Sequence, residues 1–430
     1  MNRNIALTGI LVAGCLIGVS RADLSLIQPM GEGARAFAMA NNYVALSGDL
    51  SAMFWNPAGF AFVPARELQI SFDGLSQRTA STFLGNDGSA TNAASSVSRP
   101  RLVDIGYMHA FPTVQGGFTL AASYHSTYLF DNVQAVSGTY YPFGSVLDAA
   151  SVTSEQKSYG GLDMWSAGFG LQVAKGLGIG AAVSVVSGRG DGSFMLQRIT
   201  NGGIADPVND YYDGTTNDSY IGYDIRLGLL YSFLQRYSIG VRLVVPQTIW
   251  FTENQSWNFQ YSPDTNYSDS YTGKLFSSFS GAIGGAAKFP FLTVSAEVRA
   301  RAPYSMQDPL AKIPDTSLAA KTMLGAGIGL EAPLGVSWVL ARAGFSWDQF
   351  DTHLFVKQYD GEDPGWDPQG LSPVGNRLQG TVGMGFIIKN VMLEWAYGFD
   401  TWKLETKGDA GTLDETHVQQ RLLASLSFRF

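Results

Sequence analysis

The chain ends on ten residues whose alternation decides the fold, Arg421-Leu-Leu-Ala-Ser-Leu-Ser-Phe-Arg-Phe430. Successive side chains of a strand point to opposite faces, so this stretch places one apolar row on a single face, made of Leu422, Ala424, Leu426, Phe428 and Phe430. Soluble domains usually fray at their ends with polar residues. A strand that stays apolar to the last residue and ends on an aromatic is typical of the closing strand of a bacterial outer-membrane β-barrel.

The same alternation recurs through most of the chain, in fourteen period-2 segments from Arg66 onward. In the clearest segment, residues 221–231, the apolar side chains share one face while Asp224 and Arg226 lie on the other. A dry core on both faces would bury two charges, whereas lipid outside and a polar lumen inside accommodate both. Segments 237–245, 292–299 and 391–400 follow the same pattern.

The segments are joined alternately by short links and by long polar stretches. We expect the long stretches to be extracellular loops, at 76–100, 130–161, 188–218, 246–273, 301–320, 348–376 and 401–416. Short turns on one rim and long loops on the other are typical of an even-stranded outer-membrane barrel. A β-propeller or sandwich does not predict this alternation. The predicted fold is therefore an all-β, 14-stranded antiparallel transmembrane barrel.

The composition argues against two other classes of protein. Only 15% of the 430 residues are charged, against about 25% in a typical soluble domain. A helical membrane protein needs runs of about 20 apolar residues, and none occurs after residue 22. The formal net charge of -8 argues against a nucleic-acid partner, which would require a basic face.

The N-terminus has the pattern of an export signal. A short polar start over residues 1–4 is followed by an apolar run over 5–19 and a small-residue site at 20–22. We expect a signal peptide over residues 1–22 and a mature chain from Asp23. The only cysteine, Cys15, also fits a lipoprotein processing site, and in that alternative Cys15 is lipidated.

Residues 23–65 do not follow the period of two. Two Ala-rich stretches, Gly33–Ala40 and Leu50–Trp55, are compatible with short helices and are punctuated by glycine and proline. They precede the first strand, so they lie at the periplasmic end of the barrel. Because a barrel this wide is otherwise an open channel, we expect residues 23–65 to form an N-terminal plug, or hatch, inside a barrel of residues 66–430.

The plug resembles the hatch of the FadL/TodX family of outer-membrane transporters over three stretches, Gly33-Ala-Arg-Ala36, Tyr43-Val-Ala-Leu-Ser-Gly-Asp-Leu-Ser-Ala52 and Phe54-Trp-Asn-Pro-Ala-Gly59. The likeness at motif level covers about residues 31–60, and the remainder matches in strand pattern. The resemblance implies a fourteen-stranded barrel with a hatch. It also implies passive passage of hydrophobic substrates, such as long-chain fatty acids or aromatic hydrocarbons, by a route that hatch movement opens and that can leave sideways through the wall.

Asn56, Pro57 and Ala58 form the most specific part of this resemblance. Proline fixes φ, lacks an N–H and biases the preceding residue away from helix, so the chain must turn at Asn56. The amide of Asn56 can bond exposed backbone across that turn. The triplet is either part of a gate or a rigid corner that only packs the plug.

Four arginines, Arg226, Arg242, Arg299 and Arg342, are predicted to point into the lumen. A guanidinium binds a carboxylate through two parallel hydrogen bonds, so these residues are candidates for holding a fatty-acid head group. The favoured interpretation is a structural network that braces the wall with the lumenal carboxylates Asp224, Glu297 and Glu394.

Aromatic residues are concentrated after Pro246, beginning with Trp250 and Phe251. They are candidates for a hydrophobic landing site, although those nearest Pro246 also suit an aromatic girdle or strands that extend above the membrane. Arg189-Gly-Asp191, in a predicted extracellular loop, matches an adhesion tripeptide, which is common by chance.

No catalytic residue, metal site or cofactor is predicted. The four histidines have no metal-ligand spacing. Ser123 and His125 share one face of a strand, but they have no evident third member and no oxyanion donors.

Together these features predict an outer-membrane channel for passive uptake of long-chain fatty acids or similar lipophiles. Two alternatives stay open, a surface-exposed structural protein or adhesin with a closed barrel, and a porin for polar solutes. The expected partners are a hydrophobic small molecule, outer-membrane lipids and the barrel-assembly machinery, which would bind the final strand ending at Phe430.

Overall fold

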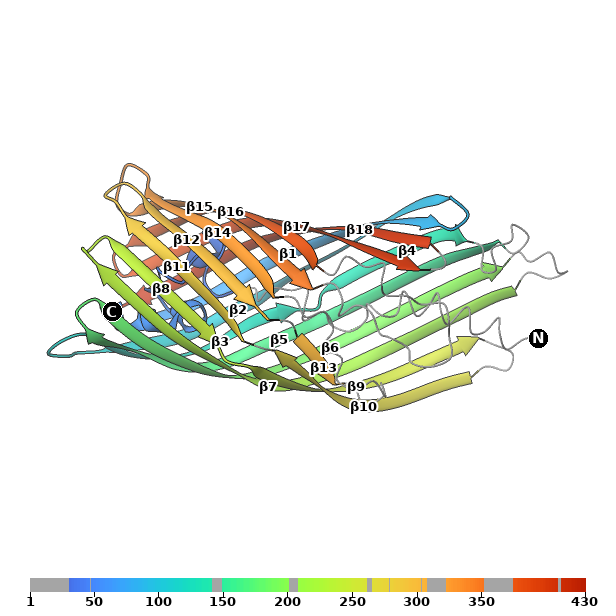
Figure 1. The fold of residues 1–430 in the computed structure, drawn as a ribbon, viewed down its shortest axis with the longest axis horizontal. Coiled ribbons are helices and arrows are strands. Elements are labelled where there is room, and N and C mark those ends of the chain that lie inside the picture. The colour runs from blue at the N-terminus through green and yellow to red at the C-terminus, as the bar shows by residue number, and fades with distance from the viewer. Residues whose placement is uncertain are drawn as a thin grey trace.

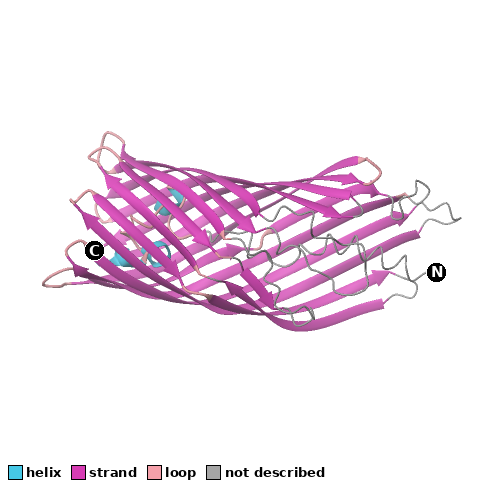
Figure 2. Cartoon of the chain, viewed as in Figure 1, coloured by secondary structure: helices cyan, strands magenta, loops and turns pink. Residues whose placement is uncertain are grey.

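The computed structural model describes residues 31–46, 48–140, 149–200, 208–260, 265–277, 279–302, 304–307, 322–351, 374–408 and 411–430. Strands dominate this part of the chain (Figures 1 and 2). In the N-terminal half they are β1 (Glu67–Gly85), β2 (Ala90–Phe111), β3 (Phe118–Leu129), β4 (Asn132–Tyr140), β5 (Ala150–Ala174), β6 (Leu177–Thr200), β7 (Val208–Phe233), β8 (Tyr237–Val244) and β9 (Gln247–Gln260). In the C-terminal half they are β10 (Thr265–Ser277), β11 (Ser280–Lys288), β12 (Thr293–Arg301), β13 (Tyr304–Gln307), β14 (Met323–Pro333), β15 (Val339–Asp351), β16 (Val374–Ile388), β17 (Val391–Gly408) and β18 (Gly411–Arg429).

These eighteen segments form one closed antiparallel barrel. Four pairs, β3/β4, β8/β9, β10/β11 and β12/β13, are single strands with a short interruption, so the wall has fourteen strands, as predicted. The last strand closes the cylinder on the first, in a register that runs from Glu67 opposite Arg429 to Gly85 opposite Gly411. Closure leaves no sheet edge there to face lipid with unmade hydrogen bonds. None of the described helices has the length and hydrophobicity of a membrane-spanning helix.

The two faces of the wall are the ones that the alternation predicts. On β7, Ile221 is 60% exposed on the outside while Asp224 is 0% exposed on the inside. The outward apolar row continues through the neighbouring strands, for example at Val241 on β8 and Leu393 on β17. An apolar outer belt around a polar interior is what a bilayer requires of a barrel.

The prediction that the long polar stretches are loops is wrong for most of their described residues, because these residues belong to strands. In β6 and β7 the alternation continues beyond the lipid belt, but there the polar residues face outward and the apolar residues face inward. Asp191 and Asn217 point outward there, whereas Phe194 and Tyr212 are buried inside. Water outside the membrane favours polar residues on the outer face, so the polar composition marks the end of the lipid belt and not the end of the strand. Residues 308–321 and 352–373 lie outside the described residues.

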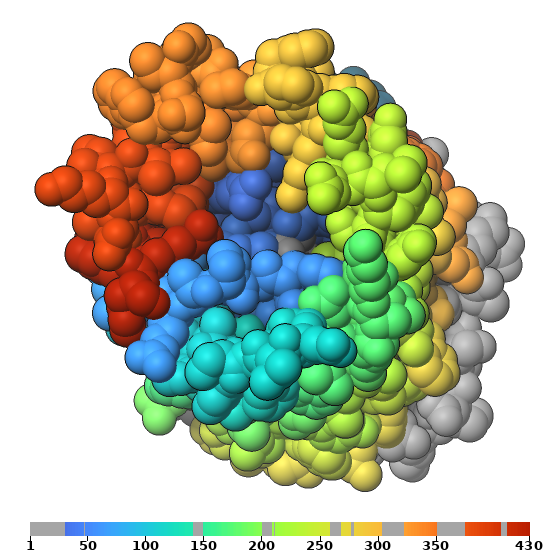
Figure 3. Space-filling view, turned by 90° about the vertical axis from the view of Figure 1, so that its left-hand side faces the viewer, coloured from blue at the N-terminus to red at the C-terminus, as the bar shows by residue number. Residues whose placement is uncertain are grey.

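The segment of residues 31–65, which we call the plug, lies in the lumen at the end where the short turns are (Figure 3). It contains two short α-helices, α2 (Ala34–Ala38) and α3 (Ala52–Trp55), and the 3₁₀-helix η1 (Pro57–Phe62). Both α-helices fall in the Ala-rich stretches that the sequence marked as helix-compatible. Nearly all of their side chains are buried against the wall.

The wall is interrupted where β3 passes into β4. β2 pairs with β3 only from Phe111 to Asp104, whose partner is His125, while β3 and β4 both stay paired with β5. The residues 125–131 are all buried, so the alternation is lost and this stretch turns inward. We call this gap in the pairing of β2 with β3 and β4 the lapse. Side chains bridge it, with Arg99 Nη1 3.1 Å from the Asp131 carboxylate.

Candidate functional site

Hydrogen bonds from the wall hold the plug around its circumference. The backbone N–H groups of Tyr43 and Val44 both donate to Glu297 on β12, at 3.1 Å each. On the other side, the N–H of Ala34 donates to Ser425 Oγ on β18 at 3.0 Å. Short plug helices leave many backbone groups without an intrahelical partner, and lumenal side chains satisfy them. The polar inner face therefore serves the plug as well as solvent.

Asn56 ties the plug to itself and to the wall. Its Nδ2 donates to the Val44 carbonyl at 2.8 Å and to the Leu229 carbonyl on β7 at 3.1 Å. Its Oδ1 accepts from the Ala58 N–H at 3.2 Å, and Pro57 begins η1. The predicted turn with an amide bonding across it is confirmed, and all three residues of the triplet are buried. Whether the triplet also gates stays a prediction.

A ring of wall glycines, which was not predicted from the sequence, makes room for the plug. A side-chain carbon at any of these positions would collide with plug atoms. The glycines are Gly106, Gly168, Gly170, Gly178, Gly180, Gly228, Gly240, Gly327, Gly329, Gly344, Gly383 and Gly398. Pairs such as Gly178 and Gly180, on the inward face of one strand, were the signal that could have revealed them.

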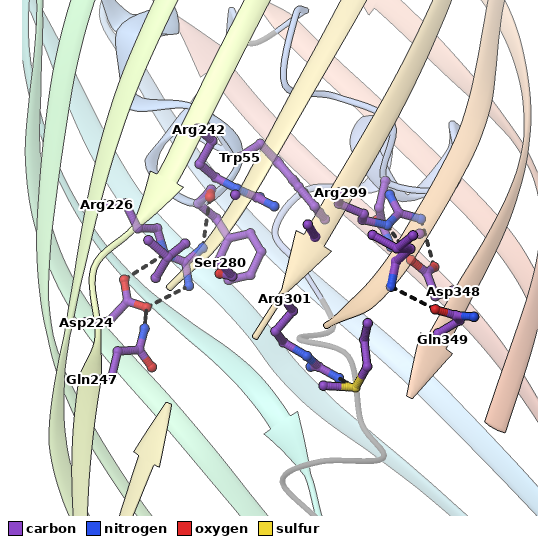
Figure 4. A pocket seen from close by; sticks show the side chains of 18 of the residues that line it. Trp55, Asp224, Arg226, Arg242, Gln247, Ser280, Arg299, Arg301, Asp348 and Gln349 are labelled. Atoms are coloured by element: carbon purple, nitrogen blue, oxygen red, sulfur yellow. Dashed lines mark hydrogen bonds and ion pairs between the residues drawn. The ribbon is translucent and has the colours of Figure 1, made fainter. Parts of the chain in front are cut away.

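A cavity of about 100 Å³ lies between the plug and the wall. It is lined by Phe54 and Trp55 of the plug and by arginines of β7, β8 and β12. Figure 4 shows Arg226 with Asp224 on one side, Arg299 with Asp348 on the other, and Arg242 between them. The volume suits a head group and not a whole lipid, since cavities for drug-sized ligands measure about 300–1,000 Å³.

Two of the cavity arginines are held by carboxylates. Arg226 makes a bidentate ion pair with Asp224 at 2.7 and 3.1 Å, and its Nη1 also donates to the Phe54 carbonyl at 2.8 Å. Arg299 makes a bidentate pair with Asp348, in which Nη2 lies 2.8 Å from Oδ2. These two arginines therefore behave as the structural network predicts.

Arg342 lies away from the cavity, in a chain of charges that joins the plug to the wall. Its side chain is fully buried between Glu331 at 2.7 Å and Glu394 at 2.8 Å. Glu331 also accepts two hydrogen bonds from Arg35 of the plug, at 2.8 Å each. The predicted partner Glu394 is confirmed, whereas Glu331 was not foreseen.

Arg242 is the exception among the four predicted arginines. It makes no hydrogen bond to a described residue, and its buried Nε has no partner. Its guanidinium lies 5.6 Å from the centre of the Trp55 ring. A partly desolvated guanidinium at a cavity without a carboxylate partner is suited to bind an anionic group.

The predicted aromatic pair is divided between the two faces of the wall. Trp250 points outward, is 42% exposed and lies beside Tyr223, as in a membrane girdle. Phe251 points inward and belongs to a buried apolar cluster with Tyr220 and Tyr271. Only Phe251 is therefore placed to meet a molecule in the lumen.

Two apolar clusters of buried side chains lie on the inner face of the wall, on the side of the cavity away from the short turns. The nearer cluster contains Tyr128, Phe130, Leu162, Met164, Val186, Tyr220, Ile249, Phe251 and Tyr271. The farther one contains Phe83, Val136, Tyr140, Ala150, Val152, Phe194, Leu196, Tyr212 and Leu413. Tyr128 lines the cavity as well as the nearer cluster, so apolar side chains lead to the arginines.

Other candidates from the sequence find little support. Arg189-Gly-Asp191 lies inside β6, paired with β5 and β7 on both sides, and not in a loop. Ser123 and His125 both point inward, but neither side chain has a hydrogen-bond partner within the described residues. In the same residues no group of three or more potential metal ligands occurs.

No known family model matches the sequence, and no curated protein does. Solved structures match the fold. The toluene transporter TodX of P. putida has a TM-score of 0.61 and 15% identity, over 93% of this chain and 99% of that chain. A FadL homologue of Pseudomonas aeruginosa gives 0.61 and 14%, over 94% and 98%, and the Ralstonia pickettii toluene transporter TbuX gives 0.55 and 16%, over 93% and 98%. The chain therefore has the fold of the FadL-homologue and TodX-type transporters.

Proposed function

We propose that this chain is an outer-membrane channel through which hydrophobic small molecules diffuse inward past a movable plug. The main support is the part of the lumen beyond the plug, where two apolar clusters replace the polar inner face of the belt and adjoin the cavity above the plug. A porin for polar solutes has a water-filled, polar lumen. The structural neighbours, described as transporters of toluene and as a FadL homologue, support the same reading.

We propose further that the substrates include lipophilic acids, with Arg242 as the residue that binds the carboxylate. Arg242 faces the cavity without a carboxylate of its own, unlike Arg226 and Arg299. The acyl chain would lie among the apolar residues beyond Tyr128. Neutral aromatic compounds would use the same apolar path without needing Arg242.

Uptake into proteoliposomes tests both levels of the proposal. Reconstituted protein is expected to speed entry of a labelled long-chain fatty acid and of toluene over protein-free liposomes. Failure with both compounds, or a large ion conductance of the intact protein, would defeat the channel proposal. Arg242→Leu is expected to slow the acid at least tenfold and leave toluene unchanged, with Arg236→Leu on an exposed turn as control. Equal effects on both compounds would remove Arg242 as the carboxylate site.

The lapse in pairing between β2 and β3/β4 is our candidate for a sideways exit. Ser95 Oγ donates to the Val133 carbonyl across it, so a disulfide between Ser95→Cys and Val133→Cys would fasten the two sides. Oxidation is expected to slow uptake, and an unchanged rate would exclude this route.

A further inference from the structure

The backbone of the plug forces one carboxylate into the interior. Glu32 lies between Gly31 and Gly33, whose φ angles of 67° and 85° belong to the left-handed region that favours glycine. A side chain at Gly31 would collide with the ring of Trp55, whose Nε1 donates to the Glu32 carbonyl at 2.9 Å. Glu32 is 0% exposed as a result. Any larger residue on either side would move this carboxylate.

The buried carboxylate faces a buried imidazole. Glu32 Oε2 lies 3.9 Å from His125 Nδ1, and His125 is 1% exposed. Among the described residues, both oxygens of Glu32 and both ring nitrogens of His125 lack a hydrogen-bond partner. The ring of Phe54 stands edge-on to His125, with centroids 5.3 Å apart. Burying an ionised carboxylate without a partner costs folding free energy. The presence of Glu32 at this position therefore requires an explanation.

The surrounding charges disfavour ionisation of Glu32. Asp104 on β2, Glu67 on β1 and Asp49 of the plug repel a negative charge there, while Arg226 on β7 attracts it. Burial, reinforced by those carboxylates, raises the pKa of Glu32 well above its usual range. His125 is also the last residue of β3 that pairs with β2. The pair thus lies where the plug meets the lapse in the wall.

We propose that Glu32 and His125 form a proton-binding site that keeps the start of the plug packed while Glu32 is protonated. In a released plug Glu32 is solvated and titrates near the ordinary value of about 4.3. The packed state holds the proton of Glu32 more tightly than the released state does. The stability that this proton gives to the packed plug is therefore complete below about pH 4.3 and is lost as the pH rises through the raised pKa. This regulation goes beyond the proposed function, and it can be tested without any substrate.

Hydrogen exchange of the full mature protein in detergent or liposomes tests the site. After correction for the intrinsic pH dependence of exchange, the amides of residues 32–40 are expected to exchange at least tenfold faster at pH 8 than at pH 5. Glu32→Gln, which cannot ionise, is expected to exchange slowly at both pH values. Glu415→Gln, which removes a buried carboxylate of β18 bonded to Gln134 and not to the plug, is expected to keep the wild-type rise.

His125→Phe tests the partner. Without the imidazole an ionised Glu32 loses the neighbouring N–H group that could turn to donate a hydrogen bond to it, so the rise between pH 5 and pH 8 is expected to exceed that of the wild type. A flat wild-type profile, or a Glu32→Gln profile that rises like the wild type, would overturn the proposal. Faster exchange of Glu32→Gln at every pH would also overturn it, because Glu32 would then act as one half of an ion pair. None of these outcomes bears on uptake itself.

Discussion

The lumenal arginines differ in whether a carboxylate holds them, and this difference separates structural from ligand-binding roles. Arg226 and Asp224 are both buried and lie two residues apart on β7, so each neutralises the other. Removing one member of a buried pair leaves an uncompensated charge, which costs about 3–5 kcal/mol. Arg242 makes no ion pair within the described residues, and Glu297 attracts it only from beyond contact distance.

Arg226→Ala is therefore expected to lower the free energy of unfolding by about 3–5 kcal/mol, whereas Arg242→Ala is expected to lower it by about 1 kcal/mol, the value of a cation–π contact with Trp55. The shift in denaturant midpoint, followed by heat-modifiable gel migration of the folded barrel, measures both. Equal shifts for the two variants would contradict the division of roles.

Some of this site follows from the sequence and some does not. The alternation put Arg226 and Asp224 on one face, and it did the same for Arg299 and Glu297. Asp348 could not be assigned to Arg299, because the pairing depends on the register of strands that are distant in sequence. The lack of an ion pair at Arg242 within the described residues could not be predicted either, because the alternation does not show which side chains of neighbouring strands lie beside it.

At the scale of elements, the inner face of each strand is matched to the plug. On β1, Asp73 accepts hydrogen bonds from Arg101 of β2 at 2.8 and 2.9 Å and from Arg421 of β18 at 2.7 Å, which joins three strands at the seam. At the level of the plug the strands carry glycine instead. Gly228 on β7 faces Asn56 and Pro57 so closely that a side chain would overlap them.

Gly228→Val is expected to displace the plug from the wall while the barrel still forms, because valine suits a strand but overlaps Asn56. Single-channel recording should then show ion conductance well above that of the wild type. Gly380→Val is the matched control, since a side chain at this outward position of β16 meets no atom within 4 Å. Conductance that is unchanged by Gly228→Val would contradict tight seating of the plug.

The positions of the strands and their outward faces were easier to predict from the sequence than the lengths of the strands. The exposed faces of β7, β8 and β17 agree with the alternation of residues 221–231, 237–245 and 391–400. The described parts of polar stretches such as 188–218, here 188–200 and 208–218, were misassigned as loops because composition changes at the edge of the lipid belt while hydrogen bonding continues. The inward turn of residues 125–131 has no simple pattern, since every one of them is buried whatever its polarity.

At the scale of the molecule, the barrel combines a lipid-facing belt, a lumen that is polar around the plug and apolar beyond it, and the plug that blocks this lumen. Transport through such a body requires the plug to rearrange, because the wall glycines and lumenal hydrogen bonds leave it little free space. The start of the plug, beside the Glu32–His125 site and the lapse in the wall, is the part that we expect to move.

A switchable cross-link between the plug and β18 tests whether the plug must move for transport. The Ala34 N–H lies 3.0 Å from Ser425 Oγ, so Ala34→Cys with Ser425→Cys can fasten the plug to β18. Ser71 Oγ lies 2.7 Å from the same Ser425 Oγ, so Ser71→Cys with Ser425→Cys ties only β1 to β18 and is the matched control. Oxidation of the first variant is expected to reduce fatty-acid uptake into proteoliposomes to the protein-free rate, with recovery on reduction and no change in the control. Undiminished uptake by the oxidised variant with Ala34→Cys and Ser425→Cys would show that transport does not need the plug to move.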